Sequence, residues 1–339
     1  MEVGIGQVGG GHEQAAGGRW VHPAMIPRSV RAAGPEAGAD TVSPVTSPEP
    51  ASAAPAPVGL LPVDGSYPPE HHVLRDLRLE SEAGPDLTAR GWIDVGDALR
   101  GPTDLAHPGA IATLVDAVGG GLAATAARPD WIATADLTMH IIPRRGVTRV
   151  QAAGRVLRAG RTTVVIEVDI TSADGDTLGM ATMTFAILPR RDGNPVIDPV
   201  AATRRTTMAL ADSGFTQSIE ATTGLRVLDD GTGAVHLPLT DYVRNTLGAV
   251  QGGMMAMTAA VAAERALSSA ADAHIDIVDL QVTYLALAKV GPVSSAVRIL
   301  DVQPDFATAH VELTDAGAAD GRVTTTVRAR GVRVPVVAS

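Results

Sequence analysis

His107-Pro-Gly-Ala-Ile-Ala-Thr-Leu-Val-Asp116 begins an apolar stretch with a single carboxylate, which is typical of a buried helix that carries one functional side chain. A related stretch, Gln251-Gly-Gly-Met-Met-Ala-Met-Thr-Ala-Ala260, follows 144 residues later and has alanine in place of the carboxylate. Gly160 and Pro304 mark corresponding turns and are separated by the same 144 residues. We infer an internal duplication with no net insertion between these landmarks, because similarity at a fixed period indicates a repeated unit.

Both halves show the same order of expected elements: two short strands, one long helix and four longer strands. In the first half we expect strands at residues 73–79, 87–95, 132–142, 147–158, 162–171 and 178–188, and a helix at 107–126. In the second half we expect a short helix at 204–211, strands at 224–228, 233–239, 275–285, 293–302, 308–314 and 322–334, and a long helix at 251–269. The turns between the long strands are short, so neighbouring strands must pair antiparallel.

The two long helices carry Ala, Gly and Met on all sides, so we expect them to be buried almost completely. One buried helix beside antiparallel strands predicts an α+β fold in which a curved sheet wraps around a central helix. The duplication predicts two such domains, at residues 58–190 and 204–336, with a linker at 191–203 that contains Pro195 and Pro199.

Residues 1–57 are rich in Gly, Ala, Pro and Ser and show no apolar periodicity. A segment of this composition buries too little surface to offset its ordering entropy, so we expect it to be disordered. The alternative is that it lies upstream of the true translation start, with Met25 nearer to that start.

The composition of the 339-residue chain narrows its class. Its formal charge of −10 argues against nucleic acid or an anionic membrane as the main partner, since both require an extended basic surface. The absence of cysteine removes disulfides, thiolate nucleophiles and cysteine-bound metals. No run approaches the roughly 18 apolar residues of a membrane span, and no secretory signal is evident, so we expect a cytoplasmic protein.

The motifs resemble those of the hotdog fold, and specifically the acyl-CoA thioesterases of the phenylacetate-degradation type. Their motif is Asn, then Gly three residues later, then His-Gly-Gly another three on, with Asp nine residues after the His. The second half resembles it with Gln in place of His, at Asn245, Gly248, Gln251, Gly252 and Gly253. The first half resembles it at His107, Gly109 and Asp116, with Pro108 in place of a glycine and Gly101 in place of Asn. The resemblance covers residues 60–336 and implies two hotdog units whose sheets join as a pseudo-dimer.

The resemblance also implies an active site at the junction of the two units, where the helix start of one faces the Asp of the other. The Gly252 N–H would stabilise the oxyanion of a thioester carbonyl, because a helix N-terminus favours negative charge. Asn245 and Gln251 would shape that loop, and Gly253 would lie beside the substrate. Asp116 would orient or deprotonate water, or attack the carbonyl itself.

The mirror junction lacks these groups. His107 and Gly109 would face Ala260, which has no carboxylate, and Pro108 has no N–H to donate. We therefore predict one active site and one inactive pseudo-site in each chain.

Each of these residues also has a structural interpretation. Asp116 would then be a polar residue hydrogen-bonded to backbone, Asn245 a turn cap and His107 a helix cap. Gln251 does not titrate, so it contributes hydrogen bonds only.

Three further features bear on the substrate. Arg158 and Arg161 flank a turn where related proteins often hold coenzyme A phosphates, whereas the equivalent turn at residues 301–305 has no cation. Thr134 and Thr138, on the strand after the helix, are candidates for placing the water. The histidines and acids lack metal-ligand spacing, so we expect neither a metal nor a redox cofactor, with coenzyme A present only as part of the substrate.

The sequence thus favours hydrolysis of a small-molecule acyl-CoA and does not identify the acyl group. One alternative is a double hotdog that binds acyl-CoA without chemistry, which the substituted motifs suggest. Another is a dehydratase or hydratase that pairs a His with an acid. Nine residues separate His107 from Asp116, about 13 Å along one helix, which disfavours joint action within one half. Paired double-hotdog chains are the expected assembly, without nucleic-acid or membrane partners.

Overall fold

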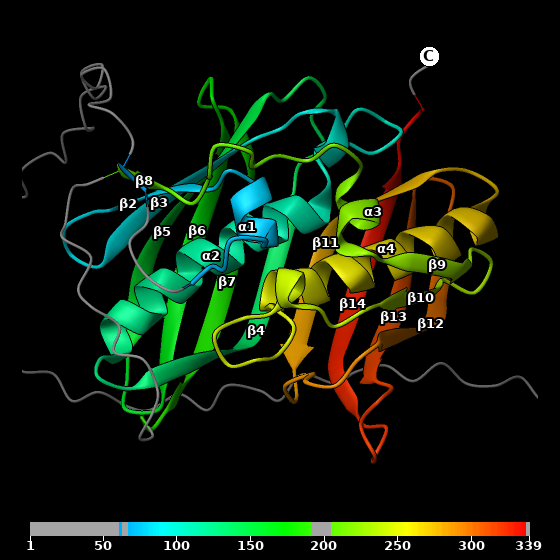
Figure 1. The fold of residues 1–339 in the computed structure, drawn as a ribbon. Helices are drawn as coiled ribbons and strands as arrows, with labels where there is room; N and C mark the ends of the chain where they lie inside the picture. Colours follow the sequence, from blue (N-terminus) through cyan, green and yellow to red (C-terminus); the bar gives the residue numbers. More distant parts are fainter. Residues whose placement is uncertain (1–60, 63–66, 191–204, 337–339) are drawn as a thin grey trace, which may run out of the picture. The chain divides into compact units, whose positions relative to one another are not determined.

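The computed structural model describes residues 61–62, 67–190 and 205–336 (Figure 1). The expectations for residues 1–57 and for the linker at 191–203 lie outside these ranges. The described elements of the first half are β1 (Leu61–Pro62), α1 (Val73–Asp76), β2 (Glu80–Ala83), β3 (Thr88–Asp94), η1 (Asp97–Leu99), α2 (Pro108–Ala127), β4 (Trp131–Ile141), β5 (Arg149–Ala159), β6 (Thr163–Ser172) and β7 (Thr177–Leu188).

The second half repeats this order. Its described elements are β8 (Arg205–Thr207), α3 (Ile219–Thr223), β9 (Arg226–Asp229), β10 (Ala234–Leu237), η2 (Asp241–Val243), α4 (Gly252–Ala271), β11 (Ile275–Tyr284), β12 (Val293–Val302), β13 (Phe306–Asp315) and β14 (Val323–Arg333). Both long helices and all eight long strands lie where the sequence predicts them, within one to two residues at most ends.

The described strands form one 14-stranded sheet in the order β1-β8-β2-β3-β5-β6-β7-β4-β11-β14-β13-β12-β10-β9. All pairs are antiparallel except β1 with β8. The two halves meet where β4 pairs with β11, with Leu280 opposite Met139. This continuous sheet confirms the α+β fold of two joined hotdog domains.

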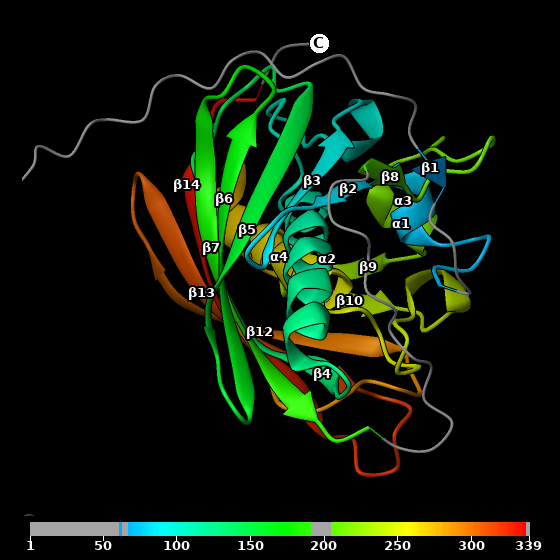
Figure 2. The ribbon, with the colours of Figure 1, turned by 90° about the vertical axis from the view of Figure 1, so that its left-hand side faces the viewer.

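α2 and α4 lie on the same face of the sheet, and the short helices α1 and α3 lie on the far side of them (Figure 2). The two long helices run antiparallel and touch closely. A Cβ atom on Gly109 would lie 2.3 Å from Met257 Cγ, and one on Gly253 would lie 2.5 Å from Thr113 Cα. Glycine at both positions is therefore required by the approach of the helices.

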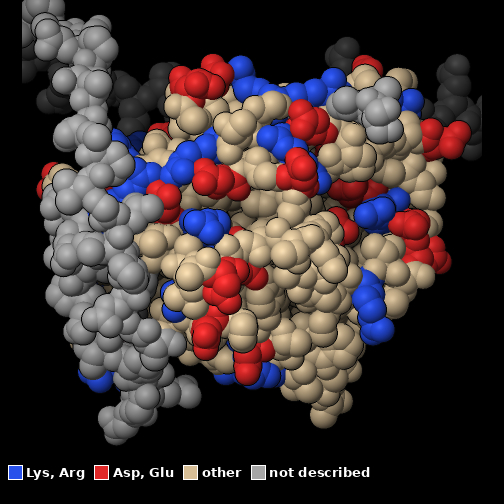
Figure 3. Space-filling model, turned by 45° about the horizontal axis from the view of Figure 1, so that its top comes forward, with Lys and Arg blue, Asp and Glu red and all other residues tan. Residues whose placement is uncertain are grey.

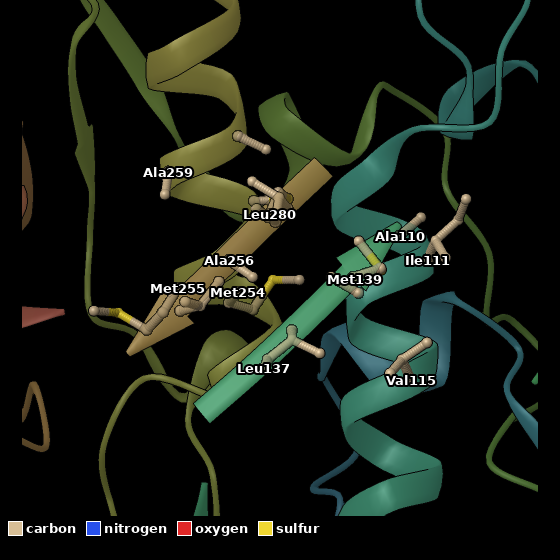
Figure 4. Close-up of a cluster of buried hydrophobic side chains, with 14 of the residues drawn as sticks. Ala110, Ile111, Val115, Leu137, Met139, Met254, Met255, Ala256, Ala259 and Leu280 are labelled. Atoms are coloured by element: carbon tan, nitrogen blue, oxygen red, sulfur yellow. The ribbon is translucent and has the colours of Figure 1, made fainter. Parts of the chain in front are cut away.

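The core lies between the sheet and these helices. Leu137 and Met139 of β4 and Leu280 of β11 are buried and point into the cluster that also receives side chains of α2 and α4 (Figure 4). Met254 and Met255 are buried in the same cluster, so they act as core residues. On the face drawn in Figure 3, positive and negative side chains are interspersed.

Two short elements differ from the expectation. Residues 73–79 do not form a strand, because the His72 side chain accepts a hydrogen bond from Leu74 N and caps the helix α1. No helix forms at the described residues 205–211, where β8 instead pairs with β2. The short helix of that half is α3, which begins after the N-cap Ser218 and ends at Gly224.

The duplication is less regular than expected. The helices α2 and α4 are offset by 144 residues, but bulges in the strands that follow are offset by 143: Thr134/Asp136 corresponds to Ile277/Asp279. The prediction of no net insertion is therefore wrong by one residue, which is lost between α4 and β11. Across the strands, Thr134 corresponds to Ile277 and Ile141 to Tyr284.

α2 is long and apolar enough to cross a membrane by composition, which differs from the sequence expectation. Of its most apolar window, 67% is buried within the fold. Its apolar character is therefore explained by its position as the central helix of the first domain.

Candidate active site

The loop before α4 is built by Asn245. Its Oδ1 accepts hydrogen bonds from Leu247 N at 2.9 Å and Ala249 N at 3.1 Å. Gly248, with φ of 74°, occupies the left-handed region that glycine adopts without strain. Gln251 N donates to Val243 O at 2.9 Å, and Gln251 is the N-cap residue of α4. Asn245 thus has the loop-shaping position that the sequence predicts.

Asp116 of α2 lies against the N-terminus of α4. Its Oδ2 accepts a hydrogen bond from Gly253 N at 3.1 Å, and its Oδ1 accepts one from Thr134 Oγ1 at 3.0 Å. The side chain is therefore held by a residue of its own domain and by a residue of the other domain.

Burial raises the pKa of Asp116 to about 6, against the opposing effect of the hydrogen bonds from Thr134 and Gly253. Such a carboxyl changes its charge close to neutral pH and is matched to general-base chemistry there.

Gly252 is the first residue of α4 and is only partly buried. Within the described ranges its N–H has no hydrogen-bond acceptor, as is usual for the first N–H groups of a helix. A Cβ at this position would lie 2.9 Å from Asp116 Oδ1, so glycine is required for the carboxylate to approach. The arrangement presents a free donor beside a buried carboxylate, which suits a reaction that generates an oxyanion.

Tyr67 and Tyr284 also border Asp116, and the sequence reasoning missed both. Burial, followed by the charge of Asp116, raises the pKa of each phenol. Tyr284 Oη donates to Gly252 O at 2.9 Å, and Tyr67 Oη donates to Arg244 O at 3.1 Å. The available signal was rarity, since the chain has only three tyrosines.

The second junction differs at each corresponding position. His107 is buried, and its Nδ1 accepts a hydrogen bond from Gly109 N at 3.0 Å. Pro108 occupies the position of Gly252, and Ala260 that of Asp116. His107 is thus a helix cap, as its structural interpretation predicts, and this helix start retains no donor at its first two positions.

The other nitrogen of His107 faces the second domain. Its Nε2 lies 3.4 Å from Glu220 Oε1, and Arg265 lies 3.4 Å from the other oxygen of that carboxylate. The hydrogen bond from His107 lowers the pKa of Glu220. His107 therefore pairs with Glu220 rather than with Asp116, which weighs against joint acid–base chemistry by His107 and Asp116.

A small cavity of about 30 Å³ borders the second junction. Pro108, Ile141 and Ile277 line it, and they correspond to Gly252, Tyr284 and Thr134 at the first junction. At these three positions the polar groups of the first junction are replaced by apolar side chains, while Arg144 and Asp276 also line the cavity.

The predicted substrate contacts have mixed outcomes. Thr134 reaches Asp116, but Thr138 is not brought to the site: Leu137 and Met139 on either side of it point into the core, so Thr138 faces the opposite side of the sheet. The bulge between Thr134 and Asp136 causes this reversal.

Arg158 and Arg161 are exposed at the β5–β6 turn. Neither forms an ion pair with any described residue. Also among the described residues, no group of three or more His, Cys, Asp or Glu side chains is arranged to hold a metal ion.

Comparisons with known families define the class of these domains. Residues 104–178 match the family model described as the thioesterase superfamily. Residues 242–334 match the model described as the acyl-CoA thioesterase N-terminal domain. The chain therefore carries two thioesterase-type hotdog domains, one in each half.

Solved structures share the fold at low identity. A protein named thioesterase II from Thermobifida fusca YX has a TM-score of 0.51 at 16% identity, over 78% of this chain and 98% of its own. The TesB protein of Mycobacterium avium subspecies paratuberculosis has a TM-score of 0.50 at 15% identity, over 73% and 93%. A protein named as a thioesterase from Novosphingobium aromaticivorans DSM 12444 has a TM-score of 0.50 at 18% identity, over 74% and 97%. These likenesses establish the shared fold alone, and no curated protein matches the sequence.

Proposed function

We propose that this protein hydrolyses an acyl-CoA thioester to the free acid and coenzyme A at the junction that contains Asp116. The thioesterase models that match both halves support thioester hydrolysis as the reaction class. The observation that carries the proposal is the 3.1 Å hydrogen bond from Gly253 N to Asp116 Oδ2, because it joins a carboxylate of one domain to the helix start of the other. The phenylacetate-type subclass stays a prediction from the motif.

In the proposed step a water molecule attacks the thioester carbonyl while Asp116 accepts one of its protons. The carbonyl oxygen gains negative charge, which the free Gly252 N–H and the positive end of α4 stabilise. The carbon–sulfur bond then breaks, and the proton held by Asp116 passes to the departing sulfur. Thr134 holds the carboxylate in position through its 3.0 Å hydrogen bond.

Direct attack by the Asp116 carboxylate on the thioester is the alternative first step. It forms a mixed anhydride and releases coenzyme A, and water then hydrolyses the anhydride. A single turnover in water labelled with oxygen-18, followed by mass spectrometry of the peptide that contains Asp116, distinguishes the two. Label in the side chain indicates direct attack with hydrolysis at the aspartyl carbon. An acylated Asp116 peptide recovered after rapid acid quenching indicates direct attack whichever carbon water then attacks, and the absence of both signals indicates that water attacks the thioester.

The exposed pair Arg158 and Arg161 supports an acyl-CoA rather than a small thioester as the substrate. Two unpaired guanidinium groups at one turn suit the phosphates of coenzyme A. Replacing both with Gln should raise KM for acyl-CoA by about tenfold and leave kcat unchanged, and it should not alter hydrolysis of the corresponding N-acetylcysteamine thioester. An equal rise in KM for both substrates would argue against a phosphate contact.

The test of the proposal is steady-state release of free thiol across a panel of short, medium, branched and aromatic acyl-CoA esters. Asp116→Asn should reduce kcat by about 10²–10⁴-fold. The matched control is Glu264→Gln, which removes another acidic side chain from the equivalent helix α4 and should retain activity. Tight acyl-CoA binding without turnover by the wild-type protein would instead favour the non-catalytic binding function.

A further inference from the structure

Tyr284 is linked to Asp116 through a single peptide group. Its Oη donates to the carbonyl oxygen of Gly252 at 2.9 Å. The N–H at the other end of that same peptide group belongs to Gly253 and donates to Asp116 Oδ2 at 3.1 Å. Two hydrogen bonds and one conjugated amide therefore connect the phenol with the carboxylate.

We propose that Tyr284 is a positioning residue for the hydrolysis, which acts through the Gly252–Gly253 peptide to orient and strengthen the N–H that holds Asp116. A hydrogen bond accepted by an amide carbonyl polarises the amide, so its N–H becomes a better donor; the gain is on the order of 10–30% for each bond in such a chain. A better donor stabilises the ionised carboxylate and keeps it aimed at the α4 N-terminus. The proposal rests on the proposed function and adds a residue that does not itself touch the substrate.

The phenol is suited to this role because it remains a donor. Burial, the charge of Asp116 and the charge of Asp136 raise its pKa well above the usual value. Thr283, the preceding residue, donates from Oγ1 to Asp136 Oδ1 at 3.0 Å and fixes this end of β11. Burial and the charge of Asp116 also raise the pKa of Tyr67, which donates to a different carbonyl, that of Arg244.

The second junction has no counterpart of this connection. Ile141 corresponds to Tyr284 and has no hydroxyl group. Pro108 corresponds to Gly252, and the N–H that follows it, from Gly109, donates to His107. The phenol therefore accompanies the carboxylate at the one junction that retains it.

The test is Tyr284→Phe, which removes only the hydroxyl group. Two quantities are measured: the pH dependence of kcat/KM, and the titration of Asp116 by NMR of carboxyl-labelled protein, which requires no turnover. We expect kcat to fall about fivefold, KM to stay within twofold, and the Asp116 titration to move upward by about half a pH unit. Tyr242→Phe is the matched control, since its phenol donates to Asp76 and not to this peptide.

Incorporation of 3-fluorotyrosine into the Tyr67→Phe, Tyr242→Phe protein gives the opposite change at position 284. Fluorine makes the phenol a stronger donor, so the Asp116 titration should move downward. The proposal is overturned if the Asp116 titration is the same in Tyr284→Phe, Tyr242→Phe and wild type. A protein that hydrolyses no acyl-CoA would remove the proposed function, while the NMR titration would still decide whether the connection exists.

Discussion

The two domain junctions share the same arrangement of helix and strands but differ in the backbone N–H groups at the N-termini of their helices. At the first, Gly252 keeps a free N–H, and Asp116 occupies the neighbouring donor, Gly253. At the second, Pro108 has no N–H, and His107 occupies the donor of Gly109. Of the two junctions, only the first therefore combines an unoccupied backbone donor with a nearby acid, as the proposed chemistry requires.

Moving the carboxylate from one junction to the other is the strongest test of this difference. The double variant Asp116→Ala, Ala260→Asp should lose about 10³-fold in kcat, because the second junction has no free donor for the oxyanion. Thiol release from the best acyl-CoA of the panel measures it. Activity within tenfold of the wild type would show that the two helix starts are equivalent.

Placing a proline at the first junction, at the position equivalent to Pro108, should have the next largest effect. Gly252→Pro removes the free N–H at a helix position that tolerates proline, and it adds a Cβ close to Asp116. Gly252→Ala adds the Cβ but keeps the N–H, so it is the control. We expect kcat of the proline variant to be about 10²-fold below that of the alanine variant. Equal values would assign the loss to crowding of Asp116 alone.

Stability provides a test that requires no substrate. The pKa of Asp116 is raised from 3.8 to about 6 in the folded state, so the folded state holds the proton more tightly than the unfolded state does. The wild type therefore loses stability as pH rises from about 4 to 6, by about 3 kcal/mol, and the loss is constant above that range. Asp116→Asn should be more stable than wild type by about this amount at pH 8 and show little difference at pH 4.

Urea unfolding at both pH values, followed by circular dichroism, measures this difference. Asp212→Asn serves as the comparison, because it makes the same substitution at an exposed position. An Asp116→Asn variant that is destabilised equally at both pH values would show that Asp116 is a structural residue and not a buried acid whose ionisation lowers the stability of the fold.

The pH profile should show the smallest of the four effects. Because the base must be ionised, kcat/KM should rise through the pKa of Asp116 and reach a plateau near neutral pH. At pH 5 the rate should be about tenfold below the plateau, from the ionised fraction of a group with a pKa of about 6. A profile that is flat between pH 5 and 8 would exclude Asp116 as the base.

The motif at the first junction follows from the sequence because each of its two segments is short and local. Asn245 and the glycines after it lie at motif spacings just before and at the start of one long helix, and Asp116 lies nine residues after His107 on the other. Pro108 and Ala260 reveal the defect of the second junction for the same reason, since a missing N–H or carboxylate is evident from residue identity alone.

Other parts depend on contacts that the sequence does not encode locally. The phenol of Tyr284, at the end of β11, donates to Gly252 at the start of α4. The two residues belong to different elements, so no motif spacing predicts this hydrogen bond. Thr138 does not reach the site because a bulge between Thr134 and Asp136 reverses the alternation of β4. The one-residue deletion between α4 and β11 is visible only in the positions of the bulges of β4 and β11, because the two long helices keep the offset of 144 residues. The short helix α1 formed where strand residues were expected because a histidine side chain caps it.

The two domains, whose strands β4 and β11 pair, belong to one polypeptide. This has a consequence for how the two junctions can change during evolution. In a symmetric dimer of identical single-domain subunits, each substitution appears twice, so every change at one junction is copied at the other. Such a dimer would bury two carboxylates like Asp116 and lose about twice as much stability as pH rises from about 4 to 6. The tandem chain removes that constraint. One junction keeps the buried acid and its free backbone donor, while the other can change independently to an apolar junction whose helix start is capped.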